Sequence, residues 1–153
     1  MFKILFCCLF LYLSVSAVSV SQQSVLQQVN SEYHVSKITG TLLKALAICQ
    51  DFGMKLVTAP NAEVQAEVHK VLNGTTNDAT WLAGLYLNYD GLFQPKWVWL
   101  NSEHQFSNYT NWGEGEPILY VRGLLNCVVM QSNGFWKVDR CDEDENYFIC
   151  STK

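Results

Sequence analysis

The stretch from Trp97 to Pro117 reads Trp-Val-Trp-Leu-Asn-Ser-Glu-His-Gln-Phe-Ser-Asn-Tyr-Thr-Asn-Trp-Gly-Glu-Gly-Glu-Pro. Three tryptophans and two other aromatic residues alternate here with small polar residues, and the stretch ends at a Glu-Pro step. Large rings at this density predict an aromatic anchor for a loop-rich core. The polar tip that follows Trp112 is a candidate ligand-binding surface.

The N-terminal sequence predicts a secretory signal peptide over residues 1–17. Lys3 gives a basic start, residues 4–13 form an apolar run far shorter than a membrane span, and Val15-Ser16-Ala17 supplies small residues for cleavage. A short membrane anchor is the alternative. Residues 18–31 are rich in Ser and Gln and are expected to form a flexible leader. We therefore expect a secreted, extracellular chain without a membrane span after cleavage, with one domain over residues 32–153.

Four cysteines remain once the signal peptide is removed, at positions 49, 127, 141 and 150. An even number in a secreted domain predicts two disulfides, and the residues alone leave three pairings open. Free or metal-binding thiols are the alternative, although the chain has no Cys-x-x-Cys motif. The expected mature chain is acidic, with 14 Asp and Glu against 9 Lys and Arg once Lys3 is gone. Without a basic cluster, nucleic acid is excluded as a partner.

Two helices and several short strands are expected along the chain. Thr41 is a candidate N-cap for a helix through Asp51 that Gly53 closes, and Asn61 caps a second helix that ends at Asn73-Gly74. Strands are expected at residues 32–38 (an edge strand), 56–57, 81–87, 127–130, 135–138 and 147–150. This order indicates an α+β fold, with the two helices packed on short antiparallel strands beside a long irregular loop region.

Across about residues 33–150 the chain resembles the C-type lectin-like domain family. The resemblance is carried by Ala45-x-x-x-Cys49-x-x-x-Gly53-x-x-Leu56, by Trp81-x-x-Gly84, by Tyr109 to Pro117, and by the closing series Cys127, Trp136, Cys141 and Phe148-Ile149-Cys150. Leu42 departs from the family, which usually has Trp there. The resemblance implies a C-type lectin-like fold, a binding function, and disulfides Cys49–Cys150 and Cys127–Cys141.

In sugar-binding members of this family, a Ca²⁺ ion held by side chains also coordinates two sugar hydroxyls. By this resemblance, Glu116 is the only side-chain ligand that the chain retains. Ile118 replaces the Asn after Glu-Pro, Leu125 replaces the Glu two residues before Cys127, and Lys137-Val138 replace an Asn-Asp pair. Asp139 is one residue out of step with that pair. Because calcium takes about six to eight oxygen ligands, we expect no metal and no cofactor.

The candidate ligand-binding residues surround this altered site: Glu114, Glu116, Ile118, Tyr120, Asn126 and Lys137. We hypothesise that the Lys137 ammonium pairs with Glu116 and neutralises a carboxylate that lost its metal; the alternative is a solvated surface lysine. The apolar run from Ile118 to Leu125 suggests a contact with a protein partner, and the alternative is core filling beneath the loop.

An enzyme is not expected. Glu114 and Glu116 lie two residues apart on one loop and are not placed to flank a glycosidic bond. His34, His69 and His104 are scattered and belong to no catalytic motif. The acidic run at residues 142–145 is either a weak cation site or a solvated hairpin tip. Asn73-Gly74-Thr75 and Asn108-Tyr109-Thr110 are N-glycosylation sequons.

The sequence thus predicts a secreted C-type lectin-like glycoprotein that binds a glycan or glycoprotein through its long-loop surface without the usual calcium bridge. The alternative is a protein–protein interaction module that has lost sugar binding. Glycan binding that a chelator abolishes would instead indicate a calcium-dependent lectin.

Overall fold

The computed structural model of this chain describes residues 25–88, 94–101, 106, 108–120 and 125–153. The helices are α2 (Leu42–Asp51) and α3 (Ala62–Asn73). The strands are β1 (Leu26–Gln28), β2 (Tyr33–Ser36), β3 (Lys55–Leu56), β4 (Ala79–Leu87), β5 (Lys96–Trp99), β6 (Asn126–Gln131), β7 (Trp136–Arg140) and β8 (Tyr147–Ser151). The α+β class expected from the sequence is confirmed.

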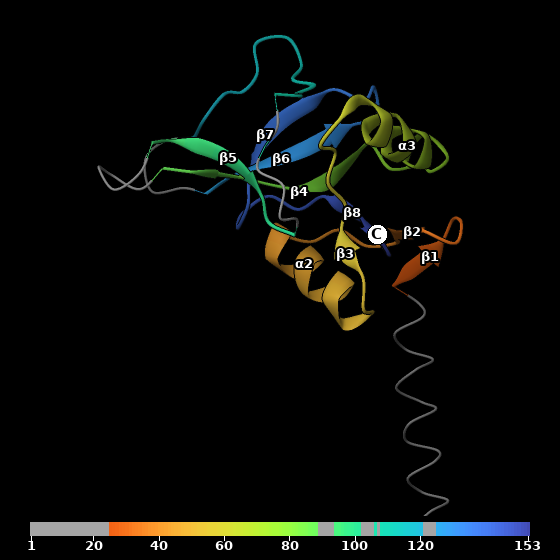
Figure 1. Cartoon of the computed structure of the whole chain (residues 1–153). Helices are drawn as coiled ribbons and strands as arrows, with labels where there is room; N and C mark the ends of the chain where they lie inside the picture. The colour runs from red at the N-terminus through yellow and green to blue at the C-terminus, as the bar shows by residue number, and fades with distance from the viewer. Residues whose placement is uncertain (1–24, 89–93, 102–105, 107, 121–124) are drawn as a thin grey trace, which may run out of the picture.

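The strands form one sheet with the order β1-β2-β8-β4-β6-β7, to which β3 adds beside β8 and β5 beside β4. All pairs are antiparallel except β4 with β8, which run parallel. Figure 1 shows β4, β6 and β7 between α2 and the teal part of the segment that joins β5 to β6. The start of this segment lies on the other side, where Asn101 donates to the Leu56 carbonyl of β3 at 3.2 Å.

Strand alternation divides the interior into two cores. Successive side chains of a strand point to opposite faces of the sheet, and in β4 this places Trp81 and Ala83 in the core beneath α2 but Leu82 in the core beneath α3. In β6, Cys127 and Val129 face the first core, whereas Val128 and Met130 face the second. The sheet centre is thus buried on both faces.

Both helices begin at the caps that the sequence predicts. The Thr41 side chain accepts the backbone N–H of Lys44 at 3.4 Å, and the Asn61 side chain accepts that of Val64 at 2.9 Å. Each bond satisfies one of the N–H groups that the first turn of a helix leaves unpaired. Gly53 follows α2 with a φ of +69°, in the left-handed region that favours glycine.

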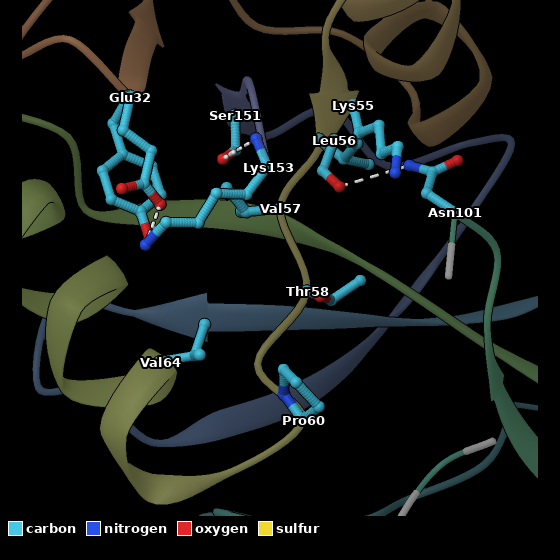
Figure 2. Close-up of a pocket in the computed structure, with 11 residues that line it drawn as sticks. Glu32, Lys55, Leu56, Val57, Thr58, Pro60, Val64, Asn101, Ser151 and Lys153 are labelled. Carbon is cyan, nitrogen blue, oxygen red and sulfur yellow. Dashed lines mark hydrogen bonds and ion pairs between the residues drawn. The ribbon is translucent and has the colours of Figure 1, made fainter. Parts of the chain in front are cut away.

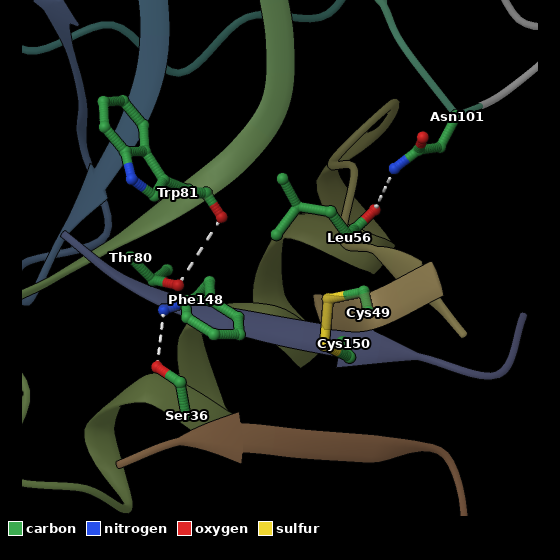
Figure 3. The surroundings of a disulfide bond; sticks show 8 residues. All are labelled: Ser36, Cys49, Leu56, Thr80, Trp81, Asn101, Phe148 and Cys150. Atoms are coloured by element: carbon green, nitrogen blue, oxygen red, sulfur yellow. Dashed lines mark hydrogen bonds between the residues drawn. A yellow bond between two sulfur atoms is a disulfide. The ribbon is translucent and has the colours of Figure 1, made fainter. Parts of the chain in front are cut away.

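Two disulfides fasten the helix and the loops to the sheet. Cys49 of α2 is bonded to Cys150 of β8, across 101 residues of sequence, and Cys127 of β6 is bonded to Cys141 at the end of β7. The first pair is packed beside Leu56 and Phe148 in the core under α2 (Figure 3). The pairing implied by the family resemblance is therefore confirmed.

Three sequence expectations need correction. Leu26–Gln28 form β1 and pair with β2, although these residues fall in the predicted flexible leader. Leu26 is buried in the core under α2, which explains why this short strand adds to the sheet. As a consequence β2 has a strand on each side and is not an edge strand.

The aromatic stretch also contains β5, which was not expected to be a strand. The signal peptide and residues 18–24 lie outside the described residues.

Candidate functional site

The free edge of β7 is covered by the segment from Asn111 to Glu116. The backbone N–H of Trp136 donates to the Asn111 carbonyl at 2.8 Å, and the Gly113 N–H donates to the Trp136 carbonyl at 2.8 Å. Trp112 and Trp136 form an isolated parallel bridge. Unpaired strand edges are templates for unwanted pairing, so this segment protects the edge and fixes the loop tip against it.

Aromatic rings support the tip from below. The ring centroid of Trp97 lies 4.9 Å from that of Trp112, and Trp99 stacks on Phe106 at 4.5 Å. Trp136 meets Trp112 edge to face at 5.5 Å. Such offset and edge-to-face pairs stabilise by about 0.5–1.5 kcal/mol each beyond their burial. The aromatic anchor expected from the sequence is present.

The Glu116 carboxylate fixes the chain on both sides of the tip. Its Oε2 atom accepts the backbone N–H of Val138 in β7 at 3.2 Å and the backbone N–H of Ile118 at 2.9 Å. Hydrogen bonds to a charged group stabilise more than those between neutral groups. Four residues after Glu116, the Tyr120 N–H donates to Oδ1 of buried Asn126 at 2.7 Å. Two side chains therefore hold the segment from Ile118 to Tyr120.

This tethering leaves the apolar side chains of the segment in solvent. The exposed fractions are 63% for Ile118, 42% for Leu119 and 39% for Tyr120, and Leu125 is 51% exposed. We call these four residues the apolar rim. Large exposed apolar side chains that gather in one loop mark interaction sites more often than isolated ones do. These four residues are exposed and do not fill the core beneath the loop, which was the alternative for this segment. Residues 121–124 of the apolar run lie outside the described residues.

Lys137 does not pair with Glu116, and the hypothesis of that ion pair is wrong. Its Nζ atom lies 2.8 Å from Oδ1 and 3.0 Å from Oδ2 of Asp139, and Asn146 donates to the same carboxylate at 2.9 Å. Strand alternation explains the difference, because Lys137 and Asp139 share one face of β7. Glu116 instead meets the backbone of β7, so the ammonium is not needed to satisfy its carboxylate.

The acidic run is organised by Arg140, which the sequence did not single out. Its guanidinium donates to Asp144 Oδ1 at 2.8 Å and to Glu143, and the Arg140 N–H donates to Asp144 Oδ2 at 2.8 Å. The hydrogen bond from Arg140 lowers the pKa of the Asp144 carboxyl below its ordinary value. The sequence contained a signal for this contact, because Arg140 precedes Glu143 by three residues and Asp144 by four.

Arg140 also connects the acidic run to the rim. The centre of its guanidinium lies over the Tyr120 ring, 5.8 Å from the centroid, within the range of a cation–π contact. In the register of β6 with β7, Arg140 lies opposite Asn126, the residue that holds the Tyr120 backbone. Tyr120, Asn126 and Arg140 thus form one packed group at the foot of the rim.

The candidate residues are brought together only in part. Glu116, Ile118, Tyr120 and Asn126 share one loop surface through the hydrogen bonds described above. Glu114 is exposed in the turn before Glu116. Lys137 is paired with Asp139, on the face of β7 opposite to Trp136, Val138 and Arg140. Asn73, the last residue of α3, and Asn108 are both exposed.

The oxygen donors at this surface do not fit the family's calcium site. Glu116 already accepts two backbone N–H groups. The side chains of Ile118, Leu125 and Val138 are apolar and contain no oxygen that could bind the ion. Calcium needs about six to eight oxygens, several of them from carboxylates. Among the residues that the structure describes, no group of three or more His, Cys, Asp and Glu side chains is arranged to hold a metal ion.

A separate hollow of about 260 Å³ lies between the end of β8, the segment after β3 and the start of α3. Figure 2 shows Val57, Pro60 and Val64 along this hollow, with Lys153 reaching toward Glu32. Lys153 Nζ lies 2.6 Å from Glu32 Oε1 and 3.4 Å from Glu67 Oε2. These charges are paired within the chain, and the hollow is smaller than most small-molecule sites. It is therefore not part of the candidate site.

The fold, the two disulfides and the loop surface define a C-type lectin domain, and comparison with known proteins agrees. Residues 38–152 match the family model described as the lectin C-type domain. The chain belongs to this family. Human C-type mannose receptor 2 is 31% identical over 110 residues, which cover 72% of this chain and 7% of the receptor. Human lymphocyte antigen 75 is 31% identical over 112 residues, or 72% and 6% of the two chains. The chain therefore spans a small part of these relatives.

Solved structures show the same fold. The mouse scavenger receptor C-type lectin carbohydrate-recognition domain superposes with a TM-score of 0.65 at 22% identity, covering 84% of this chain and 95% of that domain. Human lithostathine has a TM-score of 0.63 at 25% identity, covering 84% and 88%. Within the described part of the chain, neither helix has the length and apolar character needed to cross a membrane.

Proposed function

We propose that this domain is a secreted binding protein that recognises a glycoprotein through its long-loop surface, without a calcium bridge, and that it is not an enzyme. The observation that carries the proposal is the double role of Glu116. Its carboxylate accepts the N–H groups of Val138 and Ile118, and it thereby holds an exposed apolar segment at the position where sugar-binding relatives hold a metal.

The chemistry of the rim favours contact with the polypeptide of a glycoprotein. Ile118, Leu119 and Leu125 offer no hydrogen-bonding side chain to sugar hydroxyls, whereas they suit the apolar centre of a protein interface. Tyr120 adds a ring of the kind that is enriched at such centres. A module that binds protein without any sugar contact is therefore the second candidate, and the apolar rim is the observation that favours it.

The names of similar proteins support a glycan as part of the proposed ligand. These proteins include a mannose receptor and a carbohydrate-recognition domain, and the cow CD23 domain, with a TM-score of 0.62, was solved in the presence of an oligosaccharide. A glycoprotein ligand combines both possibilities, because a glycan and the neighbouring polypeptide surface would be contacted together. The two buried disulfides support an extracellular location, since such bonds persist in oxidising compartments.

Catalysis has no support at this surface. Glu116 is half-buried, and its Oε2 atom accepts two backbone N–H groups, which fix the carboxylate to the backbone of β7 and of the loop tip. Proton transfer requires a group within hydrogen-bond reach of the reacting atom. The arrangement suits a positioning role for Glu116, which is what a binding surface needs.

An array with three kinds of probe tests the proposal: intact glycoproteins, the same glycoproteins after enzymatic deglycosylation, and isolated glycans. We expect binding to intact glycoproteins in calcium and in chelator alike, and weaker binding after deglycosylation. The variant Ile118→Ser/Leu119→Ser should lose this binding, whereas Leu43→Ser, which alters a 75% exposed leucine on α2, should not. Binding to isolated glycans that a chelator removes would overturn the proposal. Equal binding after deglycosylation would favour the second candidate.

A further inference from the structure

The apolar rim continues into an acidic surface. The Tyr120 ring contacts Arg140 at 5.8 Å, and Arg140 in turn binds Asp144 and Glu143. Through this single arginine, the last residue of the Ile118–Tyr120 segment is packed against the loop that follows Cys141. A ligand seated on the rim would therefore have this loop as its neighbour, with Arg140 between the Tyr120 ring and the carboxylates of Glu143 and Asp144.

This loop has more negative charge than its neighbours neutralise. Residues 142–145 are four consecutive acids, and Asp142, Glu143 and Glu145 are exposed. Arg140 is shared by Glu143 and Asp144, and Lys137, which is paired with Asp139, also acts on Asp144 through its charge. Among the residues that the structure describes, Glu145 accepts the Thr39 hydroxyl at 3.2 Å and Asp142 forms no ion pair. The acids still outnumber the cations, in a chain whose net charge is −4.

We infer that the rim binds a polypeptide segment in which a basic residue, Lys or Arg, lies next to an apolar side chain. The apolar residue contacts Ile118 and Leu119, and the basic residue faces the carboxylates at residues 142–145. This inference rests on the proposed function, because it specifies the polypeptide part of the ligand that the rim recognises. Complementary charge beside an apolar centre is the usual arrangement of a specific interface.

The same charges argue against other occupants. Anionic lipid headgroups and nucleic acids would be repelled by the acidic loop. A second copy of this chain would bring the same acidic loop against the rim of its partner in a symmetric dimer, so self-association through this surface is disfavoured. A basic and apolar polypeptide satisfies both halves of the surface at once.

Two synthetic peptides provide the probes for a test on the full chain. They share one sequence of leucines and alanines and differ only in carrying lysine or glutamate at the charged positions. Dissociation constants are measured by biolayer interferometry at about 50 mM and about 500 mM salt, which changes the Debye length from roughly 14 Å to roughly 4 Å. The variants are Asp142→Asn/Glu145→Gln for the charge and Ile118→Ser/Leu119→Ser for the rim.

Matched controls carry the same changes elsewhere. Asp51→Asn/Glu63→Gln removes two exposed carboxylates, one at the end of α2 and one in the first turn of α3. Leu43→Ser removes an exposed leucine from α2. Both controls should retain the affinity of the unaltered chain and should unfold at similar temperatures. They separate a local effect at the rim from a general effect of net charge or apolar area.

The lysine peptide should bind and the glutamate peptide should not. Asp142→Asn/Glu145→Gln should weaken binding about tenfold at low salt, an effect within the range of two surface ion pairs, and should flatten the salt dependence. Equal binding of both peptides, or no binding of either, would overturn the inference. If the rim variant loses glycoprotein binding but Asp142→Asn/Glu145→Gln does not, the inference fails and the proposed function stands. If the rim variant retains glycoprotein binding, both fail.

Discussion

The Glu116 carboxylate accepts the backbone N–H of Val138 at 3.2 Å, although the family resemblance makes Glu116 a calcium ligand. The same oxygen accepts the N–H of Ile118 at 2.9 Å. A side chain retained from a metal site therefore joins the loop tip to the edge strand β7. This contact gives Glu116 a structural role that does not require an ion.

Replacing Glu116 tests this role. Glu116→Ala removes the oxygen that accepts both N–H groups, and we expect a loss of about 1–3 kcal/mol in the free energy of unfolding, because the two N–H groups lose their partner. Glu116→Gln keeps a side-chain oxygen and should retain most of the stability. Urea unfolding of both variants measures the difference. An alanine variant as stable as the unaltered chain would show that the two hydrogen bonds contribute nothing.

Gly84 lies where β4 meets β6 and β5, with no room for a side chain. A Cβ atom there would lie 2.6 Å from Cγ2 of Val128 and 3.2 Å from the Trp99 ring. We expect Gly84→Ala to destabilise the fold by about 1–3 kcal/mol through overpacking. Gly74→Ala is the control, since its nearest new contact is 3.4 Å and its φ is −76°. Thermal unfolding should separate the two variants, and equal melting temperatures would contradict the account.

The two disulfides should differ in their contribution to stability. In the chain-entropy model a bridge across about 100 residues stabilises by roughly 4–5 kcal/mol, and one across about 14 residues by roughly 3 kcal/mol. Cys49→Ser/Cys150→Ser should therefore unfold at lower urea concentration than Cys127→Ser/Cys141→Ser. The order of the two urea midpoints is the measurement. The reverse order would show that packing around each bridge outweighs the length of the loop it closes.

The Asp144–Arg140 contact predicts an acid-sensitive loop. The pKa of Asp144 is lowered by the hydrogen bond from Arg140, so this carboxylate stabilises the folded state above its unfolded pKa of about 3.9. That contribution is lost as the pH falls through the lower pKa of the folded state. Asp144→Asn should remove this part of the acid dependence while leaving the chain folded at neutral pH. An NMR titration in which Asp144 protonates at or above the ordinary value would contradict the prediction.

Much of the fold follows from the sequence because its signals are local or covalent. Thr41 and Asn61 cap the helices as expected, since each cap depends on a residue and the three that follow it. The family landmarks identified both disulfide pairs. β1 was missed because its placement depends on a single buried residue, Leu26, and on a partner strand that sequence patterns alone do not reveal.

The candidate site was less predictable, because its contacts involve backbone atoms. Charge alone suggested an ion pair between Lys137 and Glu116. Because side chains alternate along a strand, Lys137 instead lies on the same face of β7 as Asp139 and pairs with it. The backbone N–H of Val138 donates to Glu116. Side-chain identity does not indicate which backbone N–H groups an edge strand leaves unpaired. The contact between Arg140 and Tyr120 joins residues twenty apart in sequence and depends on the register of β6 with β7.

The most direct test of the account is the affinity for an array-selected glycoprotein, measured by biolayer interferometry first in calcium and then in excess chelator. A calcium-independent surface predicts the same dissociation constant in both buffers. A metal-bridged surface would lose its ligand in chelator, because the ion would supply the bonds to the sugar. An unchanged constant supports recognition through the apolar rim, and a fall in affinity of about tenfold or more, or roughly 1.4 kcal/mol, would contradict it.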